Sequence, residues 1–140
     1  MAPSCKVACI QVNAQNDMAA NIAALGQAVR DAAADGAELI TTPENVTMMA
    51  AGGREIRERA ATEDSHAGLA AFRELAAATG TWLLAGSLGI ATPSGKVGNR
   101  SYLIEPSGAI AAAYDKIHMF DVELSAGETY RESANFEPGA

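Results

Sequence analysis

The sequence has 140 residues, of which 49% are hydrophobic and 19% are charged, and its formal net charge is −7. This chain is long and apolar enough for one compact domain with a real core, spanning residues 1–140. The negative charge and the lack of any run of basic residues argue against a nucleic-acid partner, because phosphate backbones are bound by clustered Lys and Arg.

The first residues, MAPSCKVACIQV, have neither the basic start nor the long apolar stretch of a secretion signal. No window approaches about 18 uninterrupted apolar residues, so we expect no membrane span. The two cysteines, Cys5 and Cys9, lie on one face of an expected strand, too far apart for a disulfide bond. We therefore expect a cytoplasmic protein with reduced thiols, in which both cysteines are small core residues.

The chain begins with the pattern of a β-α-β unit. Residues 6–12 alternate and are rich in β-branched side chains, which predicts a strand. Asp17 is the expected N-cap of a helix that runs to about Ala34 and is closed by Gly36. The short apolar segment 37–42 predicts a buried second strand, and a connection of this length favours parallel pairing with the first.

Two more helices and a strand are expected next. Residues 54–64 predict a short exposed helix, and Ser65 is an expected cap for a longer helix that ends at Gly80. Residues 81–90 predict another buried strand. The apolar face of the longer helix consists of Leu69, Phe72, Leu75 and Ala76.

The last third of the chain reads as strands joined by tight turns. Residues 97–105 and 109–120 predict two strands, preceded by the turn sequences TPSGK and PSG. Beyond residue 120 no periodicity is sustained, so we expect a loop there. The final residues, FEPGA, resemble the lead-in to a further strand, which indicates that the domain continues past the sequence.

Missing motifs disfavour several chemistries. No GxGxxG follows the first strand and no GxxxxGK[ST] occurs, so no nucleotide-phosphate cradle is expected. The two histidines, His66 and His118, do not have zinc-site spacing, and His66 is expected to be a solvated helix residue. Ser87 lies in AGSLG rather than in a GxSxG elbow, so we interpret it as a strand serine among small residues. We expect neither a metal nor a cofactor.

Two charged residues have positions that favour chemistry. Glu44 follows the apolar strand LITTP, and ligands of open α/β folds gather beyond the carboxyl ends of strands; a plain surface carboxylate is the alternative. Lys116 shares one face of its expected strand with Tyr114, His118 and Phe120. An ammonium group in that position needs a carboxylate partner, unless it is an edge lysine that reaches solvent.

The segments KVACIQVNA, LITTPEN and NRSYLIEPSGAIAAAYDKIHMFD, in this order, closely resemble the nitrilase, or carbon–nitrogen hydrolase, superfamily. The resemblance covers the whole chain, and YDKIHMFD…YRES is most similar to the branch of ω-amidases and deaminated-glutathione amidases. It implies that Glu44 is the general base, Lys116 the catalytic lysine and Glu132 a second active-site glutamate. Glu128 is the alternative for that last position.

The same resemblance implies an α/β fold, the N-terminal half of an α-β-β-α sandwich with two sheets face to face and helices outside. The nucleophile of the family is a cysteine on a strand beyond the lysine, and neither Cys5 nor Cys9 matches it. Residues 1–140 are therefore expected to form a partial domain that is inactive alone.

The function implied for the complete enzyme is hydrolysis of a small linear carboxamide, of the 2-oxo acid ω-amide or deaminated glutathione type, through a Glu-Lys-Cys mechanism. A homodimer or larger homo-oligomer is also implied. A nitrilase or N-carbamoyl amidohydrolase of the same superfamily is one alternative. A noncatalytic binding or assembly module is the other.

Overall fold

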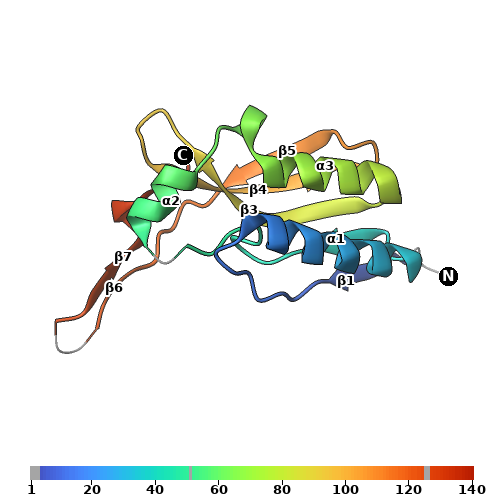
Figure 1. Ribbon diagram of the computed structural model, residues 1–140, viewed down its shortest axis with the longest axis horizontal. Helices are drawn as coiled ribbons and strands as arrows, with labels where there is room; N and C mark the ends of the chain where they lie inside the picture. Colours follow the sequence, from blue (N-terminus) through green and yellow to red (C-terminus); the bar gives the residue numbers. More distant parts are fainter. Residues whose placement is uncertain (1–3, 51, 125–126) are drawn as a thin grey trace.

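A six-stranded mixed sheet with helices on one face forms the body of the protein (Figure 1). The computed structural model describes residues 4–50, 52–124 and 127–140. In chain order the elements are β1 (Val7–Cys9), α1 (Met18–Ala34), β2 (Leu39–Thr41), α2 (Gly53–Arg59), the 3₁₀ turn η1 (Glu63–Ser65), α3 (Ala67–Thr79), β3 (Trp82–Ala91), β4 (Val97–Ile104), β5 (Ile110–Asp115), β6 (Asp121–Glu123), β7 (Thr129–Arg131), the 3₁₀ turn η2 (Glu132–Ala134) and β8 (Phe136–Glu137). The strand order in the sheet is β1-β2-β3-β4-β5, and β8 pairs with β4.

The predicted β-α-β unit is present. Strands β1, β2 and β3 pair in parallel, with Val7 opposite Leu39 and Leu39 opposite Trp82. Asp17 caps α1, because its side chain accepts a hydrogen bond from the Ala20 N–H at 3.0 Å. These two predictions are confirmed.

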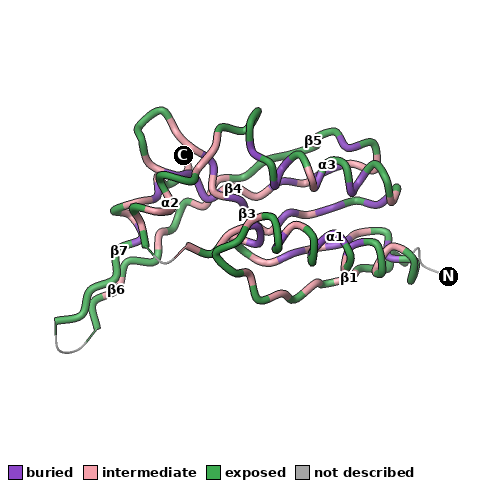
Figure 2. The backbone as a smooth tube through the Cα atoms, viewed as in Figure 1, coloured by how far each residue is buried: buried purple, intermediate pink, exposed green. Residues whose placement is uncertain are grey.

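The core lies between the sheet and helices α1 and α3, which pack side by side on one face. Figure 2 shows the buried residues along the central strands and the inner sides of these helices. The predicted apolar face of α3 is buried, each of its side chains being at most 8% exposed: Leu69, Phe72, Leu75 and Ala76. Burying one large apolar side chain stabilises the fold by roughly 1.5–3 kcal/mol.

His66, rather than Ser65, caps α3, so the expectation of a solvated histidine is wrong. Residues 63–65 form the turn η1 and leave His66 facing the interior, where it is 3% exposed. Its Nδ1 atom accepts a hydrogen bond from the Leu69 N–H at 3.2 Å. Burial lowers the pKa of His66 below its ordinary value, although a backbone hydrogen bond opposes this, so the imidazole is neutral at pH 7.

The prediction that the cysteines belong to the core is also wrong, because Cys5 and Cys9 are exposed. β1 is at the edge of the sheet, and its side chains alternate between two faces. Ala8 points to the side covered by the helices and packs against the core. Cys9 and Val7 point to the opposite side, where Val7 is 49% exposed.

The structure differs most from expectation in the last third of the chain. The strand expected over 109–120 ends at Asp115, so the strand alternation assumed for Lys116 does not continue past it. The Lys116 N–H still bonds the carbonyl oxygen of Asn99, but the carbonyl oxygen of Lys116 accepts from the Gly139 N–H instead. Where a loop was expected, β6 and β7 form an antiparallel ribbon that projects from the body (Figure 1).

The mixed α/β fold class is confirmed, with helices layered on a sheet. Residues 4–50, 52–124 and 127–140 form one six-stranded sheet and the two-stranded β6–β7 ribbon. No helix among them is long and apolar enough to cross a membrane.

Candidate active site

The turn that carries Glu44 follows β2 and lies against β3. The two backbones approach so closely that a Cβ atom on Gly86 would lie 2.0 Å from the carbonyl oxygen of Thr42, so only glycine fits there. Asn45 has a left-handed backbone, with φ 51°, and donates its N–H to Ser87 Oγ at 2.9 Å. Ser87, which is 2% exposed, therefore holds the turn that presents Glu44.

Three predicted site residues from separate parts of the chain meet at one point. Lys116 Nζ lies 3.1 Å from Oε1 of Glu44 and 3.0 Å from the carboxylate of Glu132. Glu44 comes from the turn after β2, Lys116 from the residue after β5, and Glu132 from the start of η2. One ammonium group is thus held between two carboxylates.

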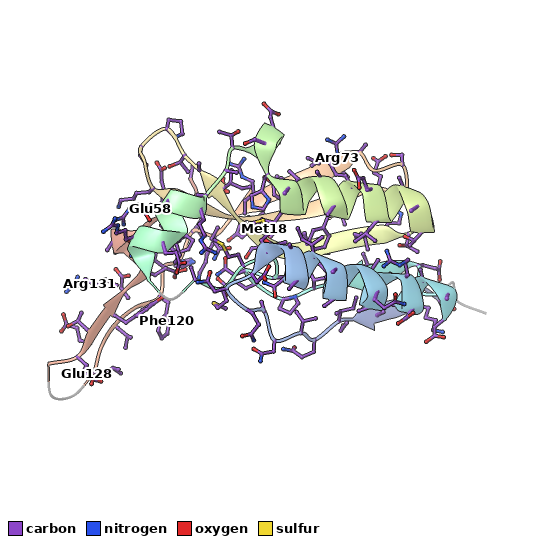
Figure 3. The ribbon with its side chains drawn as sticks, in the orientation of Figure 1. Met18, Glu58, Arg73, Phe120, Glu128 and Arg131 are labelled. Carbon is purple, nitrogen blue, oxygen red and sulfur yellow. The ribbon has the colours of Figure 1, made fainter. Side chains whose placement is uncertain are left out.

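Glu132, rather than Glu128, is the second glutamate that reaches the lysine. Glu132 is 7% exposed, and besides Lys116 it accepts a hydrogen bond from the Phe120 N–H at 2.5 Å. Glu128 is exposed near the far end of the β6–β7 ribbon (Figure 3). A buried carboxylate requires such partners, because an unpaired charge in the interior is costly.

The pKa of Lys116 is raised above its ordinary value. Partial burial lowers the pKa, but the hydrogen bonds to Glu132 and Glu44 and their negative charges more than offset this effect. The Lys116 side chain is 30% exposed. The group is therefore a charged hydrogen-bond donor at neutral pH, with one side open to solvent.

Sequence reasoning missed Asn99, which contacts the site through both its side chain and its backbone. Asn99 is 2% exposed on β4, and its Nδ2 atom donates to Oε1 of Glu44. Its carbonyl oxygen accepts the Lys116 N–H at 2.9 Å. The signal that could have drawn attention to it was the polar run Asn99-Arg100-Ser101 within a predicted strand.

An ion-pair network secures the chain immediately before Lys116. Arg100 lies opposite Asp115 in the β4–β5 register and donates two hydrogen bonds to its carboxylate, at 2.7 and 2.8 Å. Arg100 also donates to Glu63 at 2.9 Å, and the Tyr102 hydroxyl donates to the same Glu63 oxygen at 2.9 Å. The Asp115 hydrogen bond raises the pKa of Arg100, and burial raises that of Tyr102. The two hydrogen bonds between Arg100 and Asp115 fix the position of the end of β5.

A surface pocket of about 320 Å³ lies beside the three charged residues. Phe120 and Tyr130 form one wall, with their ring centroids 5.7 Å apart. The residues that line the pocket are Glu44, Asn45, Met49, Lys116, Phe120, Tyr130 and Glu132. The pocket therefore combines an apolar wall with a charged donor and carboxylate acceptors, and its size suits a small molecule.

Neither cysteine belongs to this pocket: Cys9 is on β1 and Cys5 precedes it. Within the part of the chain that the structure describes, no three His, Cys, Asp or Glu side chains are grouped so that they could hold a metal ion. The site therefore offers a carboxylate that can exchange a proton, Glu44, and an ammonium that can stabilise negative charge, Lys116.

Comparison with known proteins identifies the family. The sequence profile described as carbon-nitrogen hydrolase matches residues 6–140. This chain belongs to the carbon–nitrogen hydrolase family. Among relatives, the deaminated glutathione amidase of Yersinia enterocolitica is 30% identical over 136 residues, which cover 95% of this chain and 47% of that protein. The omega-amidase of Homo sapiens is 28% identical over 138 residues, covering 97% of this chain and 48% of that protein.

The fold agrees with the family. The NitN amidase from Nesterenkonia sp. AN1 superposes on this carbon–nitrogen hydrolase chain with a TM-score of 0.81 at 25% identity, covering 98% of this chain and 50% of that one. The chain spans about half the length of the relatives it matches. The expected membership of the nitrilase superfamily, with amidases as relatives, is confirmed.

Proposed function

We propose that this chain carries the general base and the oxyanion-stabilising lysine of an amidase that hydrolyses a small linear carboxamide. The single observation that supports the proposal most is the ammonium of Lys116, held between Glu44 and Glu132 at the edge of a small pocket. The nucleophile in this proposal is a cysteine of the same protein outside residues 1–140, since Cys5 and Cys9 lie away from the pocket.

The proposed reaction begins when Glu44 takes the proton of the cysteine thiol and the thiolate attacks the carboxamide carbon. The carbonyl oxygen becomes negative in the tetrahedral intermediate, and Lys116 stabilises it by donating a hydrogen bond from Nζ. When the carbon–nitrogen bond breaks, Glu44 returns the proton to the nitrogen, so ammonia leaves and a thioester remains.

The second half of the reaction consumes one water molecule. Glu44 removes a proton from the water, whose oxygen attacks the thioester carbon. The carbon–sulfur bond then breaks, the carboxylic acid leaves, and the sulfur regains a proton from Glu44. In this scheme Glu132, which is buried, keeps Lys116 charged and directed at the reacting oxygen.

Two features of the relatives support this class of substrate. The relatives include a deaminated glutathione amidase and an omega-amidase, so an amide at the end of a short linear acid is the substrate that we propose here. A structure of a glutamate-to-leucine mutant of the amidase from Nesterenkonia sp. AN1, 25% identical to this chain, shows the acetamide moiety of fluoroacetamide added covalently at the active-site cysteine of that enzyme. This adduct retains the amide, so it supports a reactive cysteine as the nucleophile, whereas the amide substrate is proposed from the two named relatives.

An assay of the full-length protein that contains residues 1–140 tests the proposal. Ammonia release would be measured with α-ketoglutaramate, deaminated glutathione, an aliphatic nitrile and an N-carbamoyl amino acid at equal concentrations. We expect the highest kcat/KM with one of the two amides. A preference for the nitrile or the carbamoyl compound would assign the protein to another activity of the superfamily, and no turnover of any of the four would favour a binding module.

A further inference from the structure

Asn99 contacts both Glu44, the proposed general base, and Lys116, the proposed donor to the oxyanion. Its side-chain Nδ2 donates to Oε1 of Glu44, and its carbonyl oxygen accepts the N–H of Lys116 at 2.9 Å. Asn99 is 2% exposed, so its own side of both contacts is buried. One rigid residue on β4 thereby sets the relative position of a residue after β2 and a residue after β5.

The hydrogen bonds to Glu44 are unequal between its two carboxylate oxygens. Nδ2 of Asn99 and Nζ of Lys116 both approach Oε1, the latter at 3.1 Å. Within the described residues, no side chain or backbone donor is paired with Oε2. The Glu44 side chain is 54% exposed, so the carboxylate faces the open pocket.

We propose that Asn99 is a positioning residue for Glu44. Asn99 and Lys116 together hold Oε1 of Glu44, so Oε2 is the oxygen that exchanges the proton with the nucleophile, the leaving group and water. The proposal rests on the proposed function. A carboxylate held at one oxygen cannot rotate freely, and a general base must lie within hydrogen-bond reach of the proton that it takes. The side-chain amide of Asn99 supplies this restraint without adding a charge that would compete with Lys116.

The surrounding structure keeps Asn99 in place. The neighbouring Arg100 pairs with Asp115 through two hydrogen bonds and so locks the β4–β5 register at this level. On the other side of β4, Asn99 lies opposite Gly89 of β3. The alternative to a positioning role is a core asparagine that only satisfies its own polar atoms, and the two roles predict different kinetics.

The test uses the full-length protein and the best amide substrate from the assay above. Asn99→Ala removes the donor, and Asn99→Asp keeps the shape but replaces the donor with a second carboxylate oxygen. For both we expect kcat to fall about 10- to 100-fold with KM changed less than about threefold, because Asn99 does not line the pocket. Asn21→Ala is the matched control, since Asn21 is another buried asparagine whose amide bonds the carbonyl oxygens of Gln15 and Thr47.

Wild-type kcat in a folded Asn99 variant would overturn the proposal, as would an equal loss of kcat in Asn21→Ala. Crystal structures of the two Asn99 variants give a readout that needs no activity: we expect the Glu44 carboxylate to turn away from its wild-type orientation. An unchanged Glu44 carboxylate in both variants would also overturn the proposal. If the wild-type protein hydrolyses no amide, the proposed function fails, while the position of Glu44 in the variants still decides the role of Asn99.

Discussion

The helix-covered part of the sheet and the described part of segment 116–140 are held together in different ways. Helices α1 and α3 with strands β2 and β3 enclose an apolar core in which Val29, Ile40 and Leu83 are fully buried. In the described part of segment 116–140, large side chains such as Phe120 and Tyr130 are exposed, and the Lys116–Glu132 pair is more buried than the Arg131–Glu123 pair. The first region supplies stability, and the second supplies half of the site.

This difference shows how the fold divides its tasks. Apolar burial adds up over many close-packed side chains, so it makes a rigid scaffold. A charged pair depends on the position of every atom in it, so it requires a rigid scaffold. The polar site is therefore placed where the turn after β2 and the end of β5 emerge from the rigid sheet. Three predictions sharpen the comparison.

The largest expected effect on stability comes from the core. Phe72→Ala leaves a cavity at a side chain that is 1% exposed, and we expect the free energy of unfolding to fall by about 3–5 kcal/mol, measured by urea unfolding of the full-length protein. Phe120→Ala is the matched control in the other region: Phe120 is 61% exposed, so a change within about 0.5 kcal/mol is expected. Equal losses in the two variants would contradict the division between the regions.

The largest effect on activity is expected at Lys116. Lys116→Met removes the donor to the oxyanion, so we expect turnover of the amide substrate to fall at least about 100-fold with the circular dichroism spectrum retained. Lys116→Arg keeps a positive charge beside Glu132 but changes its reach, and it should be similarly impaired. The control is Lys6→Met, because the Lys6 ammonium group donates to the Asp35 carbonyl oxygen and does not line the pocket. Near-normal turnover in Lys116→Met would refute the assigned role.

The smallest expected effect is a pH dependence of the free energy of unfolding that is caused by His66. Burial lowers the pKa of His66 in the folded protein below the ordinary value of 6.5, so below pH 6.5 the unfolded chain binds a proton that the folded protein does not. The free energy of unfolding should therefore decrease as the pH falls below 6.5, and it should be level with respect to this group above that pH. Unfolding experiments from pH 8 to pH 5 would measure this.

His66→Asn is the control for this pH effect, because asparagine retains a capping acceptor for α3 and has no proton to gain. The variant should lose stability less steeply than the wild-type protein between pH 6.5 and pH 5. Parallel curves for the two proteins would assign the pH dependence to other groups.

Much of the helical region could be predicted because its signals are local. Asp17 marks the start of α1, and the apolar periodicity through Phe72 marks the buried face of α3. Each signal lies within one segment, and the structure confirms both. The ribbon of β6 and β7 could not be predicted, since three-residue strands are too short to show an alternation. His66 and Cys9 were assigned to the wrong environment, because burial depends on which face of an element is covered.

The residues of the candidate site also differ in how far the sequence could predict them. Glu44 was marked by its place after an apolar strand, and Glu132 only by resemblance to a family. Asn99 was missed because its partners are distant along the chain: its side chain reaches Glu44, 55 positions away. The polar residues of β4 mark the position of Asn99 but do not show which distant residue it contacts.

By itself the sequence determined the β-α-β start, the apolar helix face and membership of the carbon–nitrogen hydrolase family, because each depends on the order and spacing of residues along the chain. Only the tertiary structure decided that Glu132 rather than Glu128 reaches Lys116, and that Asn99 bonds Glu44. The physical reason is that hydrogen bonds and ion pairs act over about 3 Å, so a polar site exists only after the sheet has brought distant segments together.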